Sequence, residues 1–109
     1  MIRSEFVIQD NKILSFSVTG HSGLAAAPHD ILCASVSAMT QLVINTLEEV
    51  FGASLDLLID EEEPRIEMKR YSASSENRAA AEGVLKGFYL QLCDLEKMYP
   101  THLSVRTKK

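Results

Sequence analysis

Apolar residues recur at two different spacings along this chain, and the order of those spacings leaves few folds open. A spacing of two residues, typical of half-buried strands, covers residues 2–8, 14–19, 54–59 and 66–69. A spacing of three to four residues, typical of helices, covers about 30–51 and 75–98. Leu103 and Val105 indicate a short final strand. The resulting order, ββαββαβ, predicts an α+β sandwich of two layers, with two amphipathic helices on one face of a largely antiparallel sheet.

The first two strands are expected to form a hairpin. Residues 9–12, Gln-Asp-Asn-Lys, are typical turn residues. In the second strand, apolar residues alternate with hydroxyl residues. The apolar set should therefore share the buried face, and it comprises Leu14, Phe16 and Val18.

The first predicted helix has more apolar surface than one contact with a sheet needs. Its main buried stripe is predicted to comprise Leu32, Val36, Met39, Val43, Leu47 and Val50. Further apolar residues fall outside that stripe, namely Ile31, Ala34, Ala38, Leu42 and Ile44. A helix with one face on a sheet does not need a second apolar stripe, so we expect a homodimer interface to cover it.

The size and charge of the chain exclude several classes of protein. With 109 residues there is room for one hydrophobic core, so we expect a single domain, 1–109, and neither a (β/α) barrel nor a doubly wound nucleotide fold. The chain has 11 Lys+Arg against 15 Asp+Glu, a formal net charge of −4. This balance argues against direct nucleic-acid binding, which normally needs a basic face.

The sequence also predicts the compartment in which the protein works. Residues 1–12 lack the basic start and apolar run of a signal peptide, and no stretch reaches the roughly 20 apolar residues that span a bilayer. We therefore expect a cytoplasmic protein without membrane contact. In that reducing compartment Cys33 and Cys93 should be free thiols.

Cys33 is the residue on which a chemical function would depend. With Asp30 as the N-cap, Cys33 lies in the first helical turn, where the positive end of the helix dipole favours a thiolate. The unpaired backbone N–H groups of that turn could also stabilise the oxyanion of a tetrahedral intermediate. His21 ends a strand whose following loop returns to the helix. A cysteine thiolate beside a histidine is the minimal apparatus for covalent acyl transfer.

Each of these residues also has a plainer interpretation. A lone cysteine in a helix is more often a small buried hydrophobe, and a histidine in a loop is more often solvated. His21, His29 and Cys33 could form a zinc site, but their spacing matches no common zinc motif, so we expect no metal and no other cofactor. Cys93 lies near the buried stripe of the second helix and is expected to fill the core.

Ser37 and the acidic run 60–63 each allow two interpretations. Ser37 lies one helical turn after Cys33 and could hydrogen-bond at the active centre, whereas a helical serine more often bonds to its own backbone. The acidic run is most simply a solvated turn between strands, although an acidic surface would also steer a cationic partner.

The segment 20–37 resembles the ribosomal-processing cysteine proteases, a family of small bacterial proteins. Their signature is a Gly-His pair after a strand, a short loop, and then Asp, two aliphatic residues, Cys and a run of small residues containing Ser. This chain has Gly20-His21 and, at the family's spacing, Asp30-Ile31-Leu32-Cys33-Ala34-Ser35-Val36-Ser37. The two halves together form a specific pattern, and the resemblance covers the whole chain in length and element order.

The resemblance implies a dimeric cysteine peptidase that removes a short N-terminal extension from a large-subunit ribosomal protein. Cys33 matches the family's nucleophile and His21 its general base. Asp30 caps the helix or also orients His21, and Gly20 and Ser37 are further supporting candidates. The alternative function is a non-catalytic, ribosome-associated module that uses the same cleft only to hold a peptide.

One position departs from the family's pattern. The family usually has a glycine two residues before the aspartate, in a loop thought to open for substrate, whereas this chain has Pro28. Proline fixes φ near −65° and also restricts the preceding residue, Ala27. We therefore expect a stiffer substrate loop, or one that hinges at Gly20 and Gly23 instead.

Overall fold

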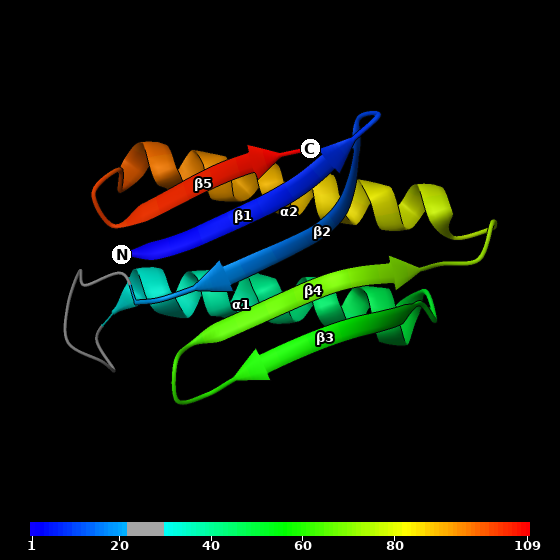
Figure 1. The fold of residues 1–109 in the computed structure, drawn as a ribbon, viewed down its shortest axis with the longest axis horizontal. Coiled ribbons are helices and arrows are strands. Elements are labelled where there is room, and N and C mark those ends of the chain that lie inside the picture. Colours follow the sequence, from blue (N-terminus) through cyan, green and yellow to red (C-terminus); the bar gives the residue numbers. More distant parts are fainter. Residues whose placement is uncertain (22–29) are drawn as a thin grey trace.

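The protein forms a five-stranded sheet that is covered on one face by two helices (Figure 1). This computed structural model describes residues 1–21 and 30–109. The elements are β1 (Ile2–Gln9), β2 (Lys12–Thr19), α1 (Ile31–Asn45), the π-helical turn η1 (Thr46–Val50), β3 (Ser54–Asp60), β4 (Arg65–Ser72), α2 (Arg78–Met98) and β5 (Leu103–Lys108). The predicted α+β class and element order are confirmed.

The strands lie in the order β3-β4-β2-β1-β5. The pairs β1–β2, β2–β4 and β3–β4 are antiparallel, and β1 with β5 is parallel. Strands that run in the same direction need a crossover connection between them, and α2 provides that crossover between β4 and β5. The sheet is therefore largely antiparallel, as the sequence predicts.

The hydrophobic core lies between the sheet and the two helices. Its largest fully buried side chains include Ile2, Phe6, Phe16, Leu32, Leu47, Met68, Leu85, Leu92 and Leu103. The ring of Phe6 lies 6.0 Å from that of Phe16 and 5.7 Å from that of Phe88 on α2, centroid to centroid. Aromatic contacts therefore join the sheet to the helix layer at the centre of the core.

Strand β2 departs from the predicted alternation at Leu14. The register of the β1–β2 ladder shifts between Val7 and Ile8, so that Leu14 becomes the extra residue of a β-bulge. As a result Ile13 is buried, while Leu14 is 40% exposed. The expectation that Leu14 faces the core is wrong, because a bulge changes which residues face inward on one side of it.

The first predicted helix divides into α1 and the π-helical turn η1. Val50, at the end of η1, is 70% exposed although the sequence places it on the buried stripe. The wider π-helical turn breaks the 3.6-residue repeat on which that stripe rests. Of the second stripe, Ile44 is buried in the core, whereas Ile31 and Leu42 are 64% and 66% exposed.

The α1–η1 segment also has the length and composition of a membrane-spanning helix. Ile31–Val50 has 20 residues and a mean hydropathy of 1.3, so by length and composition the expectation that no stretch reaches spanning length does not hold. One third of the segment is buried inside the fold, including Leu32, Val36 and Leu47 of the core. The core helix of a soluble protein meets the same criterion.

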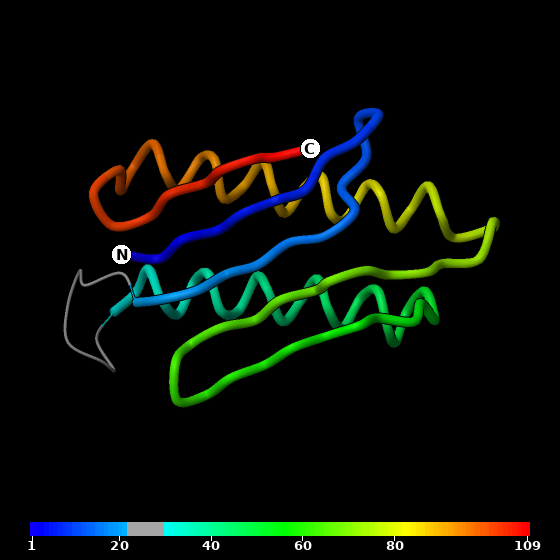
Figure 2. The backbone as a smooth tube through the Cα atoms, viewed as in Figure 1, coloured from blue at the N-terminus to red at the C-terminus, as the bar shows by residue number. Residues whose placement is uncertain are grey.

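The two ends of the sheet gather different segments (Figure 2). One end holds the start of β1, the end of β2, the start of α1 and the β3–β4 turn. The other end holds the β1–β2 turn, the end of β4 and the start of α2. Strand β2 has eight residues, and at about 3.3 Å per residue it separates the two ends by roughly 25 Å.

Candidate active site

Cys33 lies in the first turn of α1, and Asp30 caps that turn. The Cys33 amide donates a hydrogen bond to Asp30 Oδ1 over 3.0 Å. Asp30 is buried and has the extended backbone of an N-cap residue, with φ −81° and ψ 92°. The predicted cap is confirmed. The Cys33 N–H is therefore engaged in the cap.

A small pocket brings Cys33 together with two of the supporting candidates. It has a volume of about 60 Å³ and lies where α1 starts, β2 ends and β4 begins. Its lining includes Cys33, Ser37, Gly20, Ile2, Pro64 and Ile66. The sequence motif predicts the first three of these, and the other three come from segments that the motif does not contain.

Gly20 is held in place from two sides. Its φ is +87°, and a Cβ at this position would lie 2.5 Å from the carbonyl oxygen of Met1. Its N–H donates a hydrogen bond to the carbonyl oxygen of Pro64 over 2.9 Å. Only glycine combines this backbone conformation with so close an approach. His21 follows directly and is exposed, so the hydrogen bond of Gly20 to Pro64 helps to fix the backbone from which the His21 side chain extends.

The hydroxyl residues of α1 differ in whether they bond to their own helix or line the pocket. Ser35 Oγ and Thr40 Oγ1 each donate to the carbonyl oxygen four residues earlier, over 2.7 Å. This is the bonding to a residue's own helix that is usual for serine and threonine. Ser37 is exposed and lines the pocket beside Cys33, so its part in the active centre stays a prediction.

The acidic run forms the β3–β4 turn beside the same pocket. Asp60 Oδ1 accepts hydrogen bonds from the N–H groups of Glu62 and Glu63, over 3.0 and 3.3 Å. The prediction of an exposed turn is confirmed. Pro64 and Arg65, which follow the run directly in the chain, line the pocket.

Some predicted residues fall on segment 22–29, outside the described residues. Gly23 and Pro28 of the substrate loop belong to it, and so does His29 of the alternative metal site. Within residues 1–21 and 30–109, no three His, Cys, Asp or Glu side chains gather in a way that could hold a metal ion. The predictions about these loop residues therefore stay predictions.

In the part of the chain that the structure describes, neither Cys33 nor Cys93 forms a disulfide, as predicted. Cys93, however, is only half-buried and lies outside both the hydrophobic core and the side chains packed against it, so the prediction that it fills the core is wrong. It forms a hydrogen bond with Tyr89, and this bond together with burial raises the pKa of the Tyr89 phenol. The sequence could have indicated this contact, because Tyr89 lies four residues before Cys93 on the same helix.

Comparisons with known sequences assign a family to the chain. The family model described as Cysteine protease Prp matches residues 1–104. The Ribosomal processing cysteine protease Prp of Bacillus subtilis (strain 168) is 30% identical over 99 residues, which cover 90% of this chain and 88% of that protein.

Three solved structures share the fold. The protease Prp from S. aureus in complex with a covalently linked product peptide has a TM-score of 0.88 and 22% identity, covering 99% of this chain and 100% of that chain. In complex with a substrate peptide it has a TM-score of 0.81 and 21% identity, with the same coverage. SMU.848 from Streptococcus mutans has a TM-score of 0.84 and 22% identity, covering 98% and 93%. The structures show the likeness of fold, and the sequence matches show membership: this chain belongs to the Prp family of ribosomal processing cysteine proteases.

Proposed function

We propose that this protein is an endopeptidase that removes a short N-terminal extension from a large-subunit ribosomal protein, with Cys33 as nucleophile and His21 as general base. One observation carries the assignment of residues. Cys33 lines the small pocket together with Gly20, the residue directly before the exposed His21. The peptide complexes of the S. aureus relative support a peptide substrate.

The first half of the reaction forms an acyl-enzyme. His21 accepts the thiol proton of Cys33, and Cys33 Sγ forms a bond to the carbonyl carbon of the scissile peptide. The tetrahedral oxyanion then collapses, the C–N bond breaks, and His21 returns the proton to the leaving amine. The mature protein departs, and the extension stays bound to Cys33 as a thioester.

The second half releases the extension. A water molecule gives a proton to His21 and its oxygen attacks the thioester carbonyl. The C–S bond breaks, and Cys33 leaves as a thiolate that takes the proton back from the His21 imidazolium. The extension departs with a new carboxyl group, so the steps balance with water as the only co-reactant.

The first turn of α1 also supplies the stabilisation of the oxyanion. The cap uses the amide of Cys33, and the amide of Ala34 bonds to the carbonyl oxygen of Asp30. The remaining amides of the turn belong to Ile31 and Leu32, and they are the donors that we assign to the oxyanion.

Surface features support a cationic substrate and a homodimer. The exposed acidic turn 60–63 lies beside the pocket, and acidic surface attracts cationic partners. On α1, Ile31, Ala34, Ala38 and Leu42 form an exposed stripe of apolar residues. A second copy of the chain would cover this stripe, and we propose the cytoplasm, which keeps both thiols reduced, as the compartment.

The rate of thiol alkylation tests the assignment of the nucleophile. We expect iodoacetamide at neutral pH to modify Cys33 faster than a free cysteine in solution, because a cysteine nucleophile is activated by an adjacent general base, here His21. Peptide mapping by mass spectrometry separates Cys33 from Cys93, which is the matched thiol on the other helix. A Cys33 rate no greater than that of free cysteine would contradict the assignment.

A further inference from the structure

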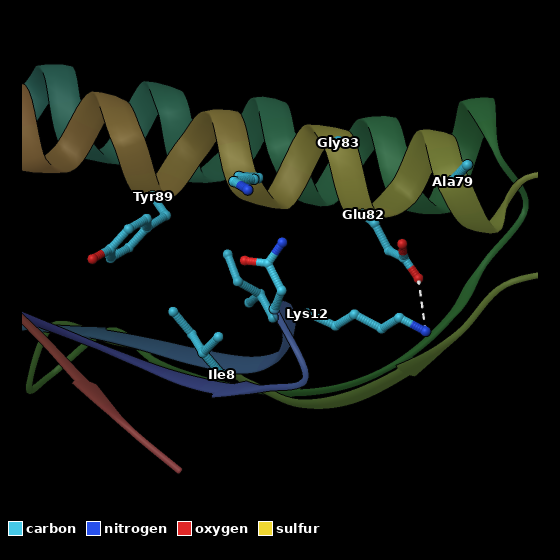
Figure 3. Close-up of a pocket in the computed structure, with 9 residues that line it drawn as sticks. Ile8, Lys12, Ala79, Glu82, Gly83 and Tyr89 are labelled. Carbon is cyan, nitrogen blue, oxygen red and sulfur yellow. Dashed lines mark ion pairs between the residues drawn. The ribbon is translucent and has the colours of Figure 1, made fainter.

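A trough lies between the β1–β2 hairpin and the first half of α2 (Figure 3). It consists of two cavities of about 320 and 510 Å³, and Lys12 and Glu82 line both. We call the two cavities together the α2 trough. Each has the size of a small-molecule site, about 300–1,000 Å³. The trough lies at the end of the sheet opposite Cys33, so it is separate from the proposed active site.

Part of the first cavity is lined by apolar side chains. Ile8 and Ile13 of the hairpin line it together with Tyr89 of α2, and Figure 3 shows Ile8 and Tyr89 on either side of the space between strand and helix. Gly83 also lines it, and a Cβ at Gly83 would meet nothing within 4 Å. A glycine inside a helix lowers the stability of that helix, and here its missing side chain keeps the cavity open.

The second cavity is basic. Lys12, Arg70 and Arg78 line it, with Glu82 as the one lining carboxylate. Arg70 Nε lies 3.3 Å from Asp56 Oδ2, so its charge is partly balanced from outside the cavity, and Arg78 and Lys12 are the main cations toward a ligand. Lys86 adds a further cation at the first cavity. Four of the 11 Lys and Arg residues of the chain therefore surround the trough, although the net charge of the chain is −4. This local concentration of positive charge favours an anionic ligand.

The start of α2 strengthens the positive potential. Arg78 is the first residue of α2, and the helix has no acidic residue in its first turn. The N-cap residue, Asn77, makes no side-chain hydrogen bond to the helix. The positive end of the helix dipole is therefore not offset by a capping side chain, and it adds to the charge of Arg78 at the second cavity.

The ion pair between the two cavities is weak. Lys12 Nζ lies 3.9 Å from Glu82 Oε1, and the two side chains are 55% and 30% exposed. Exposed pairs of this kind contribute little stability. Breaking this pair therefore costs little, although an anion at Lys12 also requires the exposed Glu82 side chain to turn away toward solvent.

We propose that the α2 trough binds a small organic phosphate ester, of which a nucleotide is the typical form. The phosphate group lies at Lys12 and Arg78, since a guanidinium can hold phosphate through two parallel hydrogen bonds. The ring system lies in the first cavity against Ile8 and Ile13, with Lys86 at its rim. This assignment needs neither Cys33 nor peptidase activity, so it stands or falls separately from the proposed function.

An NMR titration of the full ¹⁵N-labelled chain with three probes tests the proposal. We expect adenosine monophosphate to shift the amide resonances of both cavities, with saturation at about 1 mM or below. Adenosine should shift the first cavity alone and pyrophosphate the second alone, each more weakly. The proposal is overturned if pyrophosphate acts as strongly as the monophosphate, which would indicate general attraction of anions, or if no probe shifts these resonances.

Two glycines of α2 provide matched variants. Gly83→Leu fills the first cavity, whereas Gly87→Leu places the same side chain one turn later, outside both cavities and also without a neighbour within 4 Å. We expect Gly83→Leu to weaken binding of the monophosphate by at least about tenfold and Gly87→Leu to leave it unchanged. Circular dichroism monitors the folding of both. Equal binding by the two variants would refute the assignment of the ring to the first cavity.

Discussion

Gly20 precedes His21 at a point where φ is +87° and the Met1 carbonyl leaves no room for a Cβ. We expect Gly20→Ala to destabilise the fold and reduce cleavage, because its Cβ would clash with the Met1 carbonyl and its φ would be strained. Gly52→Ala is the matched control, since Gly52 has φ +64° but no neighbour within 4 Å. Strain alone costs about 1–2 kcal/mol. Urea unfolding should show a larger loss for Gly20→Ala than for Gly52→Ala, and equal losses would contradict the clash.

Substitutions of Asp30 can distinguish its role as the helix N-cap from a role in orienting His21. Asparagine caps a helix about as well as aspartate, so Asp30→Asn should keep nearly all of the stability, whereas Asp30→Ala should lose about 1 kcal/mol. If Asp30 also orients His21, Asp30→Asn lowers the cleavage rate while its unfolding midpoint stays the same. Unchanged cleavage by the asparagine variant would restrict Asp30 to the cap that the structure shows.

At the scale of elements, a tyrosine of α2 is expected to make the stability of the fold decrease at alkaline pH. The hydrogen bond to Cys93, and burial after it, raise the pKa of Tyr89 above its usual value of 10.0. The folded chain thus keeps the phenol proton longer than the unfolded chain, so this contribution is complete below about pH 10 and is lost as pH rises through the folded pKa. Urea unfolding from pH 8 to 11 should show a shallower decline for Tyr89→Phe than for the unsubstituted chain. Identical slopes would contradict this role of the phenol.

Periodicity predicts the elements well, because each strand and helix has one face against a shared core. The sequence does not reveal the bulge that exposes Leu14 or the π-helical turn that exposes Val50. The bulge and the π-helical turn each interrupt a regular repeat, and the spacing of apolar residues alone does not show where such an interruption occurs. At the site, the sequence motif indicates Gly20 and Cys33. It does not indicate the hydrogen bond between Gly20 and Pro64, because these residues are distant in the chain and meet only in the folded sheet.

At the scale of the whole molecule, the exposed stripe of α1 predicts a homodimer. We expect sedimentation at micromolar concentration to show a dimer, and Leu42→Glu to convert it to a monomer by placing a charge on the stripe. Leu90→Glu is the matched control, because Leu90 is similarly exposed but lies on α2. A monomer for the unsubstituted chain, or the same effect from both substitutions, would contradict this interface.

The identity of the nucleophile and the base is the central claim, and the intact mass of a ribosomal-protein precursor tests it most directly. The precursor from the same organism is incubated with the purified chain, with Cys33→Ala, with His21→Ala, and with Cys93→Ala as the control. The unsubstituted chain and Cys93→Ala should both remove the N-terminal extension. Cys33→Ala and His21→Ala should each be slower by at least about 10³-fold. Cleavage by Cys33→Ala at the rate of the unsubstituted chain would contradict the account.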